Sequence, residues 1–359
     1  MSALARVPVA LGALLLAACA SGPPAQLRMD LAPGAAAMFW PAAPEVPRFR
    51  YAGSLLGEGN YLRDGESRRS ALGRAFDWIA GLDGSRVGPE ELARPLAGAI
   101  ASCGAVLVSD PGRQAVLAFA PQGELAIWEY ASGIQRFASP AGIACGPGPV
   151  AWVADAQLGY VAELDLKGGS RRRIGQGVLG RPTGIAWDRE ARELYVADTK
   201  ANDIAVFDPE GRLLRRLGGP GEAEGEFNAP THLWFRDGEL YVADTMNSRI
   251  QVFVRGATKP RLVVGSRGLF VGQLVRPKGV ATDSAGNIYV IESYHDHLLV
   301  YDREGRFLLP IGGVGREPGQ FYLPAGVWTD ERDQVYVADM YNGRVVVLQF
   351  LGGEGHGAP

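Results

Sequence analysis

A motif of two short strands joined by a polar turn recurs through most of this chain of 359 residues. Its clearest copy is residues 240–253, where an alternating Tyr-Val-Ala-Asp strand precedes a polar turn and a second β-rich run. Six copies are marked by the carboxylate that ends the first strand of the pair, at Asp110, Asp155, Asp198, Asp244, Glu292 and Asp339. The spacings of 45, 43, 46, 48 and 47 residues fit one four-stranded propeller blade per copy.

Each copy divides into four strands with little room for a helix. In the third copy the strands are residues 184–188, 194–197, 204–207 and 213–217. Asp208-Pro-Glu-Gly211 fits a type I turn between the last two, because proline presets φ and glycine accepts positive φ. The pattern therefore predicts antiparallel meanders and disfavours parallel βαβ units.

A glycine-rich connector follows the fourth strand of three copies, with Gly-x-x-x-Gly-x-Phe or Leu at residues 221–227, 268–274 and 315–321. Together with the following Pro-x-Gly and with Tyr-Val-Ala-Asp-x-x-Asn-x-Arg, this connector resembles the NHL-repeat family over residues 92–350. The resemblance implies a six-bladed β-propeller, and the count of copies gives the same number independently. We therefore predict an all-β fold with the NHL propeller at residues 93–351.

One strand is missing from this count. Five copies hold a fourth strand, whereas the sixth stops after residues 345–350. Residues 48–55 have the pattern of a strand and are predicted to pair with the last blade. This pairing would seal the ring and remove an exposed edge.

The N-terminus has the composition of an export signal. Residues 1–18 carry one charge, Arg6, before an apolar run that is too short to span a bilayer. The run ends in Leu16-Ala-Ala-Cys19, which resembles a bacterial lipobox and implies cleavage before Cys19 and acylation of that residue. Several acyl chains would give durable membrane anchoring, and the residues after Cys19 favour the outer membrane by the same resemblance. An ordinary signal peptide with a chance cysteine is the alternative.

Three further segments lie outside the repeats. Residues 19–47 are rich in alanine and proline and are predicted to form a semi-extended tether, with residues 38–40 docked on the domain. Residues 56–92 form an insertion in which Leu72, Phe76 and Ile79 have helical spacing. They predict a short amphipathic helix that packs on the propeller or is offered to lipid or a partner. Residues 352–359 are predicted to be a flexible tail.

Cysteine usage, motifs and charge restrict the chemistry. With Cys19 assigned to lipidation, Cys103 and Cys145 remain near the inner strands of adjacent blades, where two buried thiols are favoured over a disulfide. No Cys-x-x-Cys-His, Gly-x-Ser-x-Gly or Walker motif occurs, and no cofactor is inferred. The formal net charge of −3 and the predicted export argue against a nucleic-acid partner.

The repeated carboxylates are predicted to lie on one face of the disc and to cap the turn that follows each strand. They lie too far apart for one ion to contact more than a couple of them, so no metal site is predicted. Peptidyl-amidoglycolate lyase, an NHL-type enzyme, resembles this chain in fold and places zinc-binding histidines near the starts of inner strands. Only His232 is similar here, because the matching positions are Gly184, Gly279 and Gly326, and catalytic zinc needs three protein ligands.

The remaining candidate is a binding face on the carboxylate side of the disc. Its predicted residues are Arg94, Arg181, Lys200, His232, Arg249, Arg276, Lys278, His295, His297 and Arg344. Solvated loop charges without a ligand are the alternative. The favoured function is a non-catalytic, lipid-anchored scaffold that binds another envelope protein, since propellers place function in their loops. The rival is an extracytoplasmic metal-dependent hydrolase or lyase, lactonase-like or amidoglycolate-lyase-like, with its site in the central channel.

Overall fold

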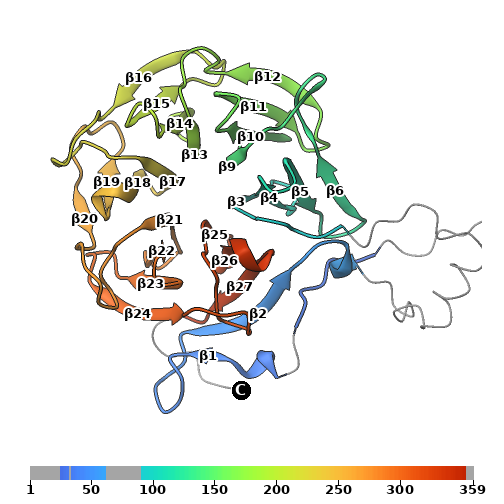
Figure 1. Cartoon of the computed structure of the whole chain (residues 1–359), viewed down its shortest axis with the longest axis vertical. Coiled ribbons are helices and arrows are strands. Elements are labelled where there is room, and N and C mark those ends of the chain that lie inside the picture. Colours follow the sequence, from blue (N-terminus) through green and yellow to red (C-terminus); the bar gives the residue numbers. More distant parts are fainter. Residues whose placement is uncertain (1–24, 32–33, 62–89, 353–359) are drawn as a thin grey trace, which may run out of the picture.

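The computed structural model describes residues 25–31, 34–61 and 90–352, and its blades are arranged around a central axis (Figure 1). Six sheets of four or five antiparallel strands form the ring. Helical structure in the described ranges is restricted to four 3₁₀ turns, namely η1 (Ala35–Ala37), η2 (Glu58–Tyr61), η3 (Thr245–Asn247) and η4 (Met340–Asn342). This architecture confirms the predicted all-β, six-bladed propeller.

Blades 1 to 3 each run from the axis to the rim in chain order. Blade 1 consists of β3 (Ala97–Ile100), β4 (Val106–Asp110), β5 (Ala115–Phe119) and β6 (Leu125–Trp128). Blade 2 consists of β9 (Pro140–Cys145), β10 (Val150–Asp155), β11 (Tyr160–Asp165) and β12 (Ser170–Ile174), and blade 3 of β13 (Pro182–Asp188), β14 (Glu193–Asp198), β15 (Asp203–Phe207) and β16 (Leu213–Leu217). A hairpin that the sequence did not predict, β7 (Tyr130–Ser132) with β8 (Gln135–Arg136), joins blades 1 and 2.

Blades 4 and 5 repeat this order, and blade 6 borrows its outer strands from the N-terminal segment. Blade 4 consists of β17 (Pro230–Arg236), β18 (Glu239–Asp244), β19 (Arg249–Val254) and β20 (Leu262–Val264). Blade 5 consists of β21 (Pro277–Thr282), β22 (Ile288–Glu292), β23 (His297–Tyr301) and β24 (Phe307–Gly312). Blade 6 consists of β25 (Val327–Thr329), β26 (Gln334–Asp339), β27 (Arg344–Phe350), β2 (Phe49–Leu55) and β1 (Phe39–Trp40).

Alternate side chains of the middle strands pack against opposite neighbouring blades. In β14, Leu194 and Val196 lie in a core shared with blade 2, whereas Tyr195 and Ala197 lie in a core shared with blade 4. This division follows from the two-residue period of a strand, because successive side chains point to opposite faces. A run such as Leu-Tyr-Val-Ala therefore fills two interfaces at once, and each blade is stabilised by its neighbours.

Close approach of the inner strands depends on small residues. A Cβ on Gly184 would lie 2.7 Å from the Cα of His232 on the next inner strand, so this position in β13 requires glycine. Blade 4 has His232 at the matching position, and the other matches are Gly142, Gly279 and Gly326. Blade 4 is thus the blade that places a titratable side chain there.

The N-terminal strand closes the ring, as predicted. β2 pairs antiparallel with β27, from Phe49 opposite Phe350 to Leu55 opposite Val345. The buried ring of Phe49 contacts Tyr289 of blade 5 and Phe350, with centroid distances of 6.0 and 5.3 Å. β1 adds a further strand outside β2 that the sequence did not predict.

The segment before β2 lies against the propeller in its described parts. The Leu27 amide donates to the Pro121 carbonyl at 3.0 Å, and Asp30 and Ser54 exchange two backbone hydrogen bonds of 2.9 Å. Met38 and Trp40 pack on the core between blades 5 and 6. The predicted semi-extended tether of residues 19–47 therefore differs from residues 25–31 and 34–40, which contact the propeller and bury part of their apolar surface there, whereas residues 42–47 are exposed.

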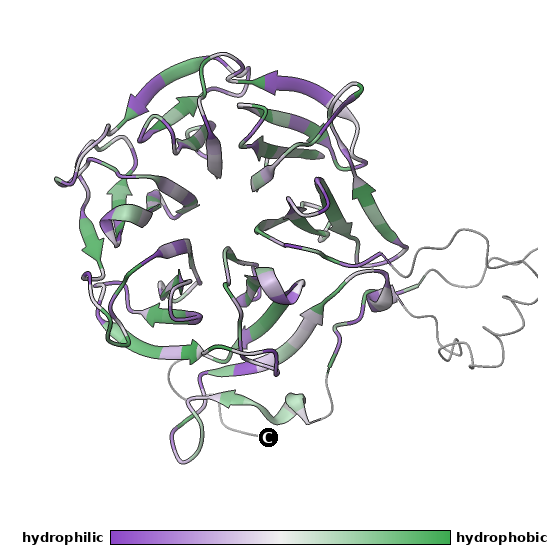
Figure 2. Ribbon diagram, in the orientation of Figure 1, coloured by the Kyte–Doolittle hydropathy of each residue, from purple (hydrophilic) through white to green (hydrophobic). Residues whose placement is uncertain are grey.

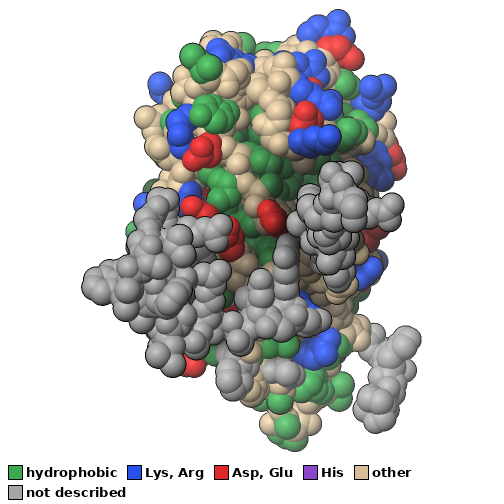
Figure 3. Space-filling view, turned by 90° about the vertical axis from the view of Figure 1, so that its right-hand side faces the viewer, with side chains coloured by type: hydrophobic (Ala, Val, Ile, Leu, Met, Phe, Trp, Pro, Cys, Tyr) green, Lys and Arg blue, Asp and Glu red, His purple; other side chains and the backbone are tan. Residues whose placement is uncertain are grey.

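Several predictions fall outside the described residues, namely the signal of residues 1–18, Cys19, the helix that includes Leu72, Phe76 and Ile79, and the tail of residues 353–359. Within the described ranges, no helix has the length and apolarity that a bilayer crossing requires. Basic and acidic side chains are interspersed on the side shown in Figure 3.

The rim changes in polarity around the ring. Figure 2 shows hydrophilic colour on the outer strands β12 and β16, which contain runs of arginine. The outer strands β20 and β24 are mainly hydrophobic. The outer edges of blades 4 and 5 are therefore less polar than those of blades 2 and 3.

Candidate functional site

The six repeated carboxylates hold the chain that enters each inner strand. Asp198 accepts the amide hydrogens of Gly180 and Arg181, both at 2.8 Å. Equivalent bonds join Asp110 to residues 93 and 94, Asp155 to 138 and 139, Asp244 to 228, Glu292 to 275 and 276, and Asp339 to 322. Bonds to the following turn, the predicted role, are also made by Asp110, Asp155, Asp198 and Glu292. All six carboxylates are buried, so they act within the fold.

Two arginines of the predicted binding face are internal clamps. Arg249 places its Nε 2.8 Å from Oδ2 of Asp244, and Arg344 repeats this contact with Asp339 at 2.8 Å. Their side chains are only 13% and 12% exposed. Their other nitrogens donate to connector carbonyls, those of Glu222, Ala223 and Glu226 for Arg249 and those of Glu317 and Gln320 for Arg344. The planar guanidinium suits this shared role, which leaves neither side chain available to a partner.

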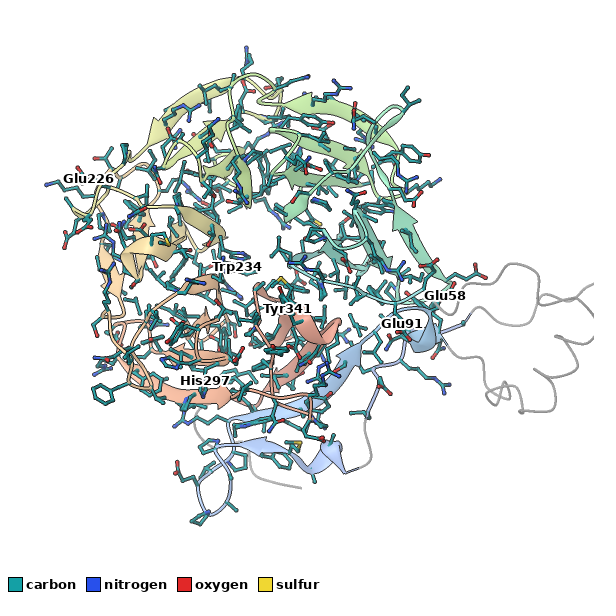
Figure 4. All side chains as sticks on the ribbon, in the orientation of Figure 1. Glu58, Glu91, Glu226, Trp234, His297 and Tyr341 are labelled. Carbon is teal, nitrogen blue, oxygen red and sulfur yellow. The ribbon has the colours of Figure 1, made fainter. Side chains whose placement is uncertain are left out.

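Blade 5 lacks this clamp. His295 and His297 stand at the positions that Asn247 and Arg249 occupy in blade 4. The His297 ring is hydrogen-bonded to the backbone of His295, and burial lowers the pKa of His297. The His295 ring lies edge-on to Tyr294, and its buried Nε2 has no hydrogen-bond partner among the described residues. In Figure 4 His297 lies farther from the centre of the ring of blades than Trp234.

Four basic side chains lie at the carboxylate ends of the inner strands of blades 3 and 5 and have no carboxylate within ion-pair distance among the described residues: Arg181, Lys200, Arg276 and Lys278. We call them the channel-mouth cations. Burial lowers the pKa of the half-buried Lys278, and the nearby Arg276 and Arg181 lower it further. Arg181 and Lys200 line an open pocket of about 480 Å³ with Ser139, Ala156, Gln157, Gly180 and Thr199. The site concentrates positive charge beside hydrogen-bonding groups and suits an anionic ligand group.

Arg94 belongs to the same predicted face but has an aromatic partner. Its guanidinium lies 5.5 Å from the ring centroid of Tyr341, close to the centre of the ring of blades (Figure 4). This cation–π contact leaves the charge of Arg94 without a carboxylate among the described residues. Arg94 can therefore add to the positive potential around the channel mouth.

His232 lies among the inner strands as the sequence predicted. Its ring is hydrogen-bonded to the backbone of Val327 on β25, and burial lowers its pKa to about 4. The side chain is therefore neutral at pH 7. Within residues 25–31, 34–61 and 90–352, no three His, Cys, Asp or Glu side chains are grouped as a metal site would require.

The cysteines differ from the prediction of two buried thiols. Cys103 is exposed, Cys145 is half-buried, and both are free. The prediction is wrong for Cys103 because the residue lies in the turn after β3 rather than in the strand. Burial raises the pKa of Cys145 to about 12, with a further contribution from the Cys103 thiol.

Sequence reasoning missed two parts of the carboxylate-side surface. One is the pocket lining supplied by Ser139 and Thr199. The other is the exposed apolar triplet Leu269, Phe270 and Val271 in the connector between blades 4 and 5. Aligning the three glycine-rich connectors with one another would have revealed the triplet, because the other two connectors carry charged residues at these positions.

Comparisons with known proteins agree with the repeat architecture. No family model matches the chain. NHL repeat-containing protein 2 of Gallus gallus is 32% identical over 150 residues, which cover 32% of this chain and 21% of that protein. Protein brain tumor of Drosophila melanogaster is 29% identical over 143 residues, which cover 38% of this chain and 13% of that protein. The chain thus spans only a small part of each relative.

Solved structures show the same fold at low identity. A streptogramin B lyase has a TM-score of 0.54 at 15% identity, with 73% of this chain and 83% of that chain covered. A chain of the nidogen/laminin complex also has a TM-score of 0.54, at 18% identity, with 70% and 89% covered. The chain is a six-bladed β-propeller, and its repeated strand pair with the glycine-rich connector is similar to the repeats of NHL proteins.

Proposed function

We propose that this propeller is a non-catalytic binding module of the bacterial cell envelope, anchored through acylated Cys19. Its channel-mouth cations receive an acidic segment of a protein partner. Propellers suit such a role because a rigid ring of strands presents loops that can vary without disturbing the fold. The pocket beside Arg181 and Lys200 provides room for a side chain of that segment.

The observation that carries this proposal is a contrast between two sets of cations on one face. Arg249 and Arg344 each have a carboxylate at 2.8 Å, whereas the channel-mouth cations have none among the described residues. A half-buried ammonium such as Lys278 loses hydration without gaining a counter-charge, which costs free energy. A carboxylate brought by a partner would supply that charge and would form charge-assisted hydrogen bonds.

The envelope setting is proposed from the lipobox-like Leu16-Ala-Ala-Cys19. Acylation of Cys19 would tether the propeller, because each buried methylene contributes about 0.8 kcal/mol and several chains add up. Replacing Cys19 with Ser is expected to move the protein from the membrane fraction to the soluble fraction. Unchanged membrane association of this variant would contradict the proposed anchor.

Affinity capture from detergent-solubilised membranes of the native host tests the partner. The parent protein is expected to retain a stable companion, and the double variant Arg181→Glu with Lys278→Glu is expected to lose it. The companion should also dissociate as the salt concentration rises, because exposed charge pairs are screened. Circular dichroism of both proteins checks that the variant remains folded.

A matched control reverses two charges at the other end of the strands. Lys167 follows β11 and Arg189 follows β13, on the side opposite the repeated carboxylates. Lys167→Glu with Arg189→Glu is expected to keep the companion. Recovery of the parent protein alone, or equal retention by both double variants, would contradict an acidic partner at the channel mouth.

The metal-dependent hydrolase or lyase makes a different prediction. Purified protein would then contain stoichiometric zinc or calcium, and His232→Ala would lose it. That result would replace the scaffold with an enzyme whose site lies in the channel. Metal-free protein that retains its companion would support the scaffold.

A further inference from the structure

The connector between β20 and β21 exposes three consecutive apolar side chains. Leu269, Phe270 and Val271 are 67%, 79% and 57% exposed. Isolated apolar residues are common on protein surfaces, whereas contiguous ones mark sites of interaction. The channel-mouth site does not explain why these three apolar side chains are exposed.

The other two glycine-rich connectors show that the fold does not need apolar residues here. The same positions hold Glu222-Ala-Glu224 before blade 4 and Arg316-Glu-Pro318 before blade 6. All three connectors share one local structure, since each has a parallel bridge at its base. In each, a Glu or Gln side chain also accepts the amide of the middle residue of the triplet. The apolar triplet is thus a property of one loop and is not required by its backbone.

This connector is also the one without the arginine clamp. Arg249 and Arg344 hold the carbonyls of the other two connectors, whereas blade 5 has His297 at that position. Neither His295 nor His297 donates to the connector among the described residues. The loop consequently has fewer hydrogen bonds to its blade and is freer to adjust its tip to a partner.

Two exposed arginines, Arg267 and Arg276, flank the triplet in the sequence. Residues 255–282 contain six lysines and arginines and no aspartate or glutamate, but Arg255 pairs with Asp188 and Arg261 pairs with Glu239, so these two do not add unpaired charge. At the base of the loop, Arg267 donates to the Ser248 hydroxyl and the Met246 carbonyl, which are neutral acceptors. Arg276, just beyond the loop, is exposed and has no carboxylate partner among the described residues. An apolar tip with cations at its base complements a surface that is apolar inside and negative outside.

We infer that Leu269, Phe270 and Val271 form a membrane-contact tip that inserts into an anionic lipid surface. Lipid favours this shape because acyl chains rearrange around a protruding tip, whereas a protein partner must offer a matching cavity. The arginines at the base would lie at the level of the lipid phosphates. This inference does not use the Cys19 anchor, and of the channel-mouth cations it uses only Arg276.

The rim position of the tip leaves the channel mouth accessible. Gly272, which follows the triplet, lies against the ring of Phe307 on β24, the outermost strand of blade 5 (Figure 1). The Tyr301 hydroxyl donates to the Gly272 carbonyl at 3.0 Å and fixes the loop at this edge. Phe307 itself is 38% exposed, so an apolar ring lies on the surface next to Gly272. Insertion at one edge would tilt the disc against the membrane and keep its centre free.

Vesicle co-sedimentation tests the inference. The chain from residue 19 with Cys19→Ser keeps every described residue and removes both the acyl chains and the apolar run of residues 7–18. It is expected to bind vesicles of phosphatidylcholine with about one third phosphatidylglycerol more tightly than vesicles of phosphatidylcholine alone. The variant Leu269→Glu, Phe270→Ala, Val271→Glu, which carries the triplet of the preceding connector, is expected to bind about tenfold or more weakly.

Two controls separate vesicle binding by the tip from binding by exposed leucines elsewhere and from loss of folding. Leu213 and Leu214 on β16 are 42% and 49% exposed, and Leu213→Ser with Leu214→Ser is expected to leave vesicle binding unchanged. Equal urea midpoints for all variants establish that they fold. As a second measurement, Phe270→Trp is expected to show tryptophan quenching by brominated acyl chains beyond that of the parent.

Three results would overturn the inference. They are equal vesicle binding by the parent and the triplet variant, no binding of the parent to phosphatidylglycerol vesicles, and absence of extra quenching in Phe270→Trp. Triplet-dependent binding to a protein without triplet-dependent binding to vesicles would assign the tip to a protein partner and would also overturn it.

Discussion

Arg249 on β19 donates from its Nε to Oδ2 of Asp244 on β18 across 2.8 Å. The carboxylate is fully buried, and the same guanidinium holds carbonyls of the preceding connector. We expect Arg249→Gln to lower the free energy of unfolding by about 3–5 kcal/mol, because it leaves a buried charge unpaired. Urea unfolding followed by circular dichroism measures this change.

Arg267→Gln is the control for the clamp. The Arg267 side chain is exposed and, within the part of the chain that the structure describes, donates only to the Met246 carbonyl and the Ser248 hydroxyl. Its loss is expected to cost about 1 kcal/mol or less. Equal losses for Arg249→Gln and Arg267→Gln would contradict a clamping role for Arg249.

Closure of the ring depends on Phe49. Its ring is buried against Tyr289 and Phe350, so Phe49→Ala opens a cavity between the closing strand and blade 5. The expected loss is about 3–5 kcal/mol of unfolding free energy. Phe39→Ala, at an exposed position of β1, serves as the control and should change the urea midpoint little. An unchanged midpoint for Phe49→Ala would show that β2 does not seal the ring.

His232 gives the folded protein a pH-dependent stability. Burial lowers the His232 pKa from 6.5 to about 4 in the folded chain, so the unfolded chain binds the proton more readily between these values. The contribution of His232 to the free energy of unfolding is therefore complete above pH 6.5, falls as the pH is lowered and is lost near pH 4. It amounts to about 3 kcal/mol at most. Urea unfolding between pH 6.5 and pH 4 should show that the free energy of unfolding falls more steeply for the parent than for His232→Asn. Parallel curves for the two proteins would contradict a contribution from His232.

The two thiols of the propeller should react at different rates. Cys103 is exposed, whereas Cys145 is half-buried with its pKa raised to about 12. Since the thiolate is the reacting species, native protein is expected to react with a maleimide about a hundredfold more slowly at Cys145 than at Cys103. Peptide mass spectrometry measures both rates, and the Cys103→Ser variant isolates the slower one. Similar rates in folded protein would contradict the burial of Cys145.

Short-range patterns were sufficient for the ring. The spacing from Asp198 to Asp244 predicted one blade per repeat, and the alternation in residues 48–55 predicted the closing strand. Both depend on the two-residue period of strands and on the length of chain that one sheet consumes, which are local properties. The sequence also predicted that His232 and Gly184 occupy the same position in their repeats, because that alignment too depends only on the repeat spacing.

Long-range contacts decided which of the predicted binding residues are free. Arg249 and Lys278 look alike in the sequence, but only Arg249 meets a carboxylate and the carbonyls of a connector more than twenty residues earlier. The segment before β2 was misjudged similarly, because its contacts are with blades distant in sequence, whereas Cys103 was misjudged locally, because it lies in the turn after β3.

The sequence by itself determined the number of blades, their strand order and the strand that closes the ring, because periodic hydrophobicity encodes each blade within its own repeat. Only the tertiary structure decided that Asp244 engages Arg249, that Lys278 remains without a counter-charge and that Phe270 is left in water. Those outcomes arise where loops from different repeats meet, and the free energy of such contacts depends on distances that no local pattern contains.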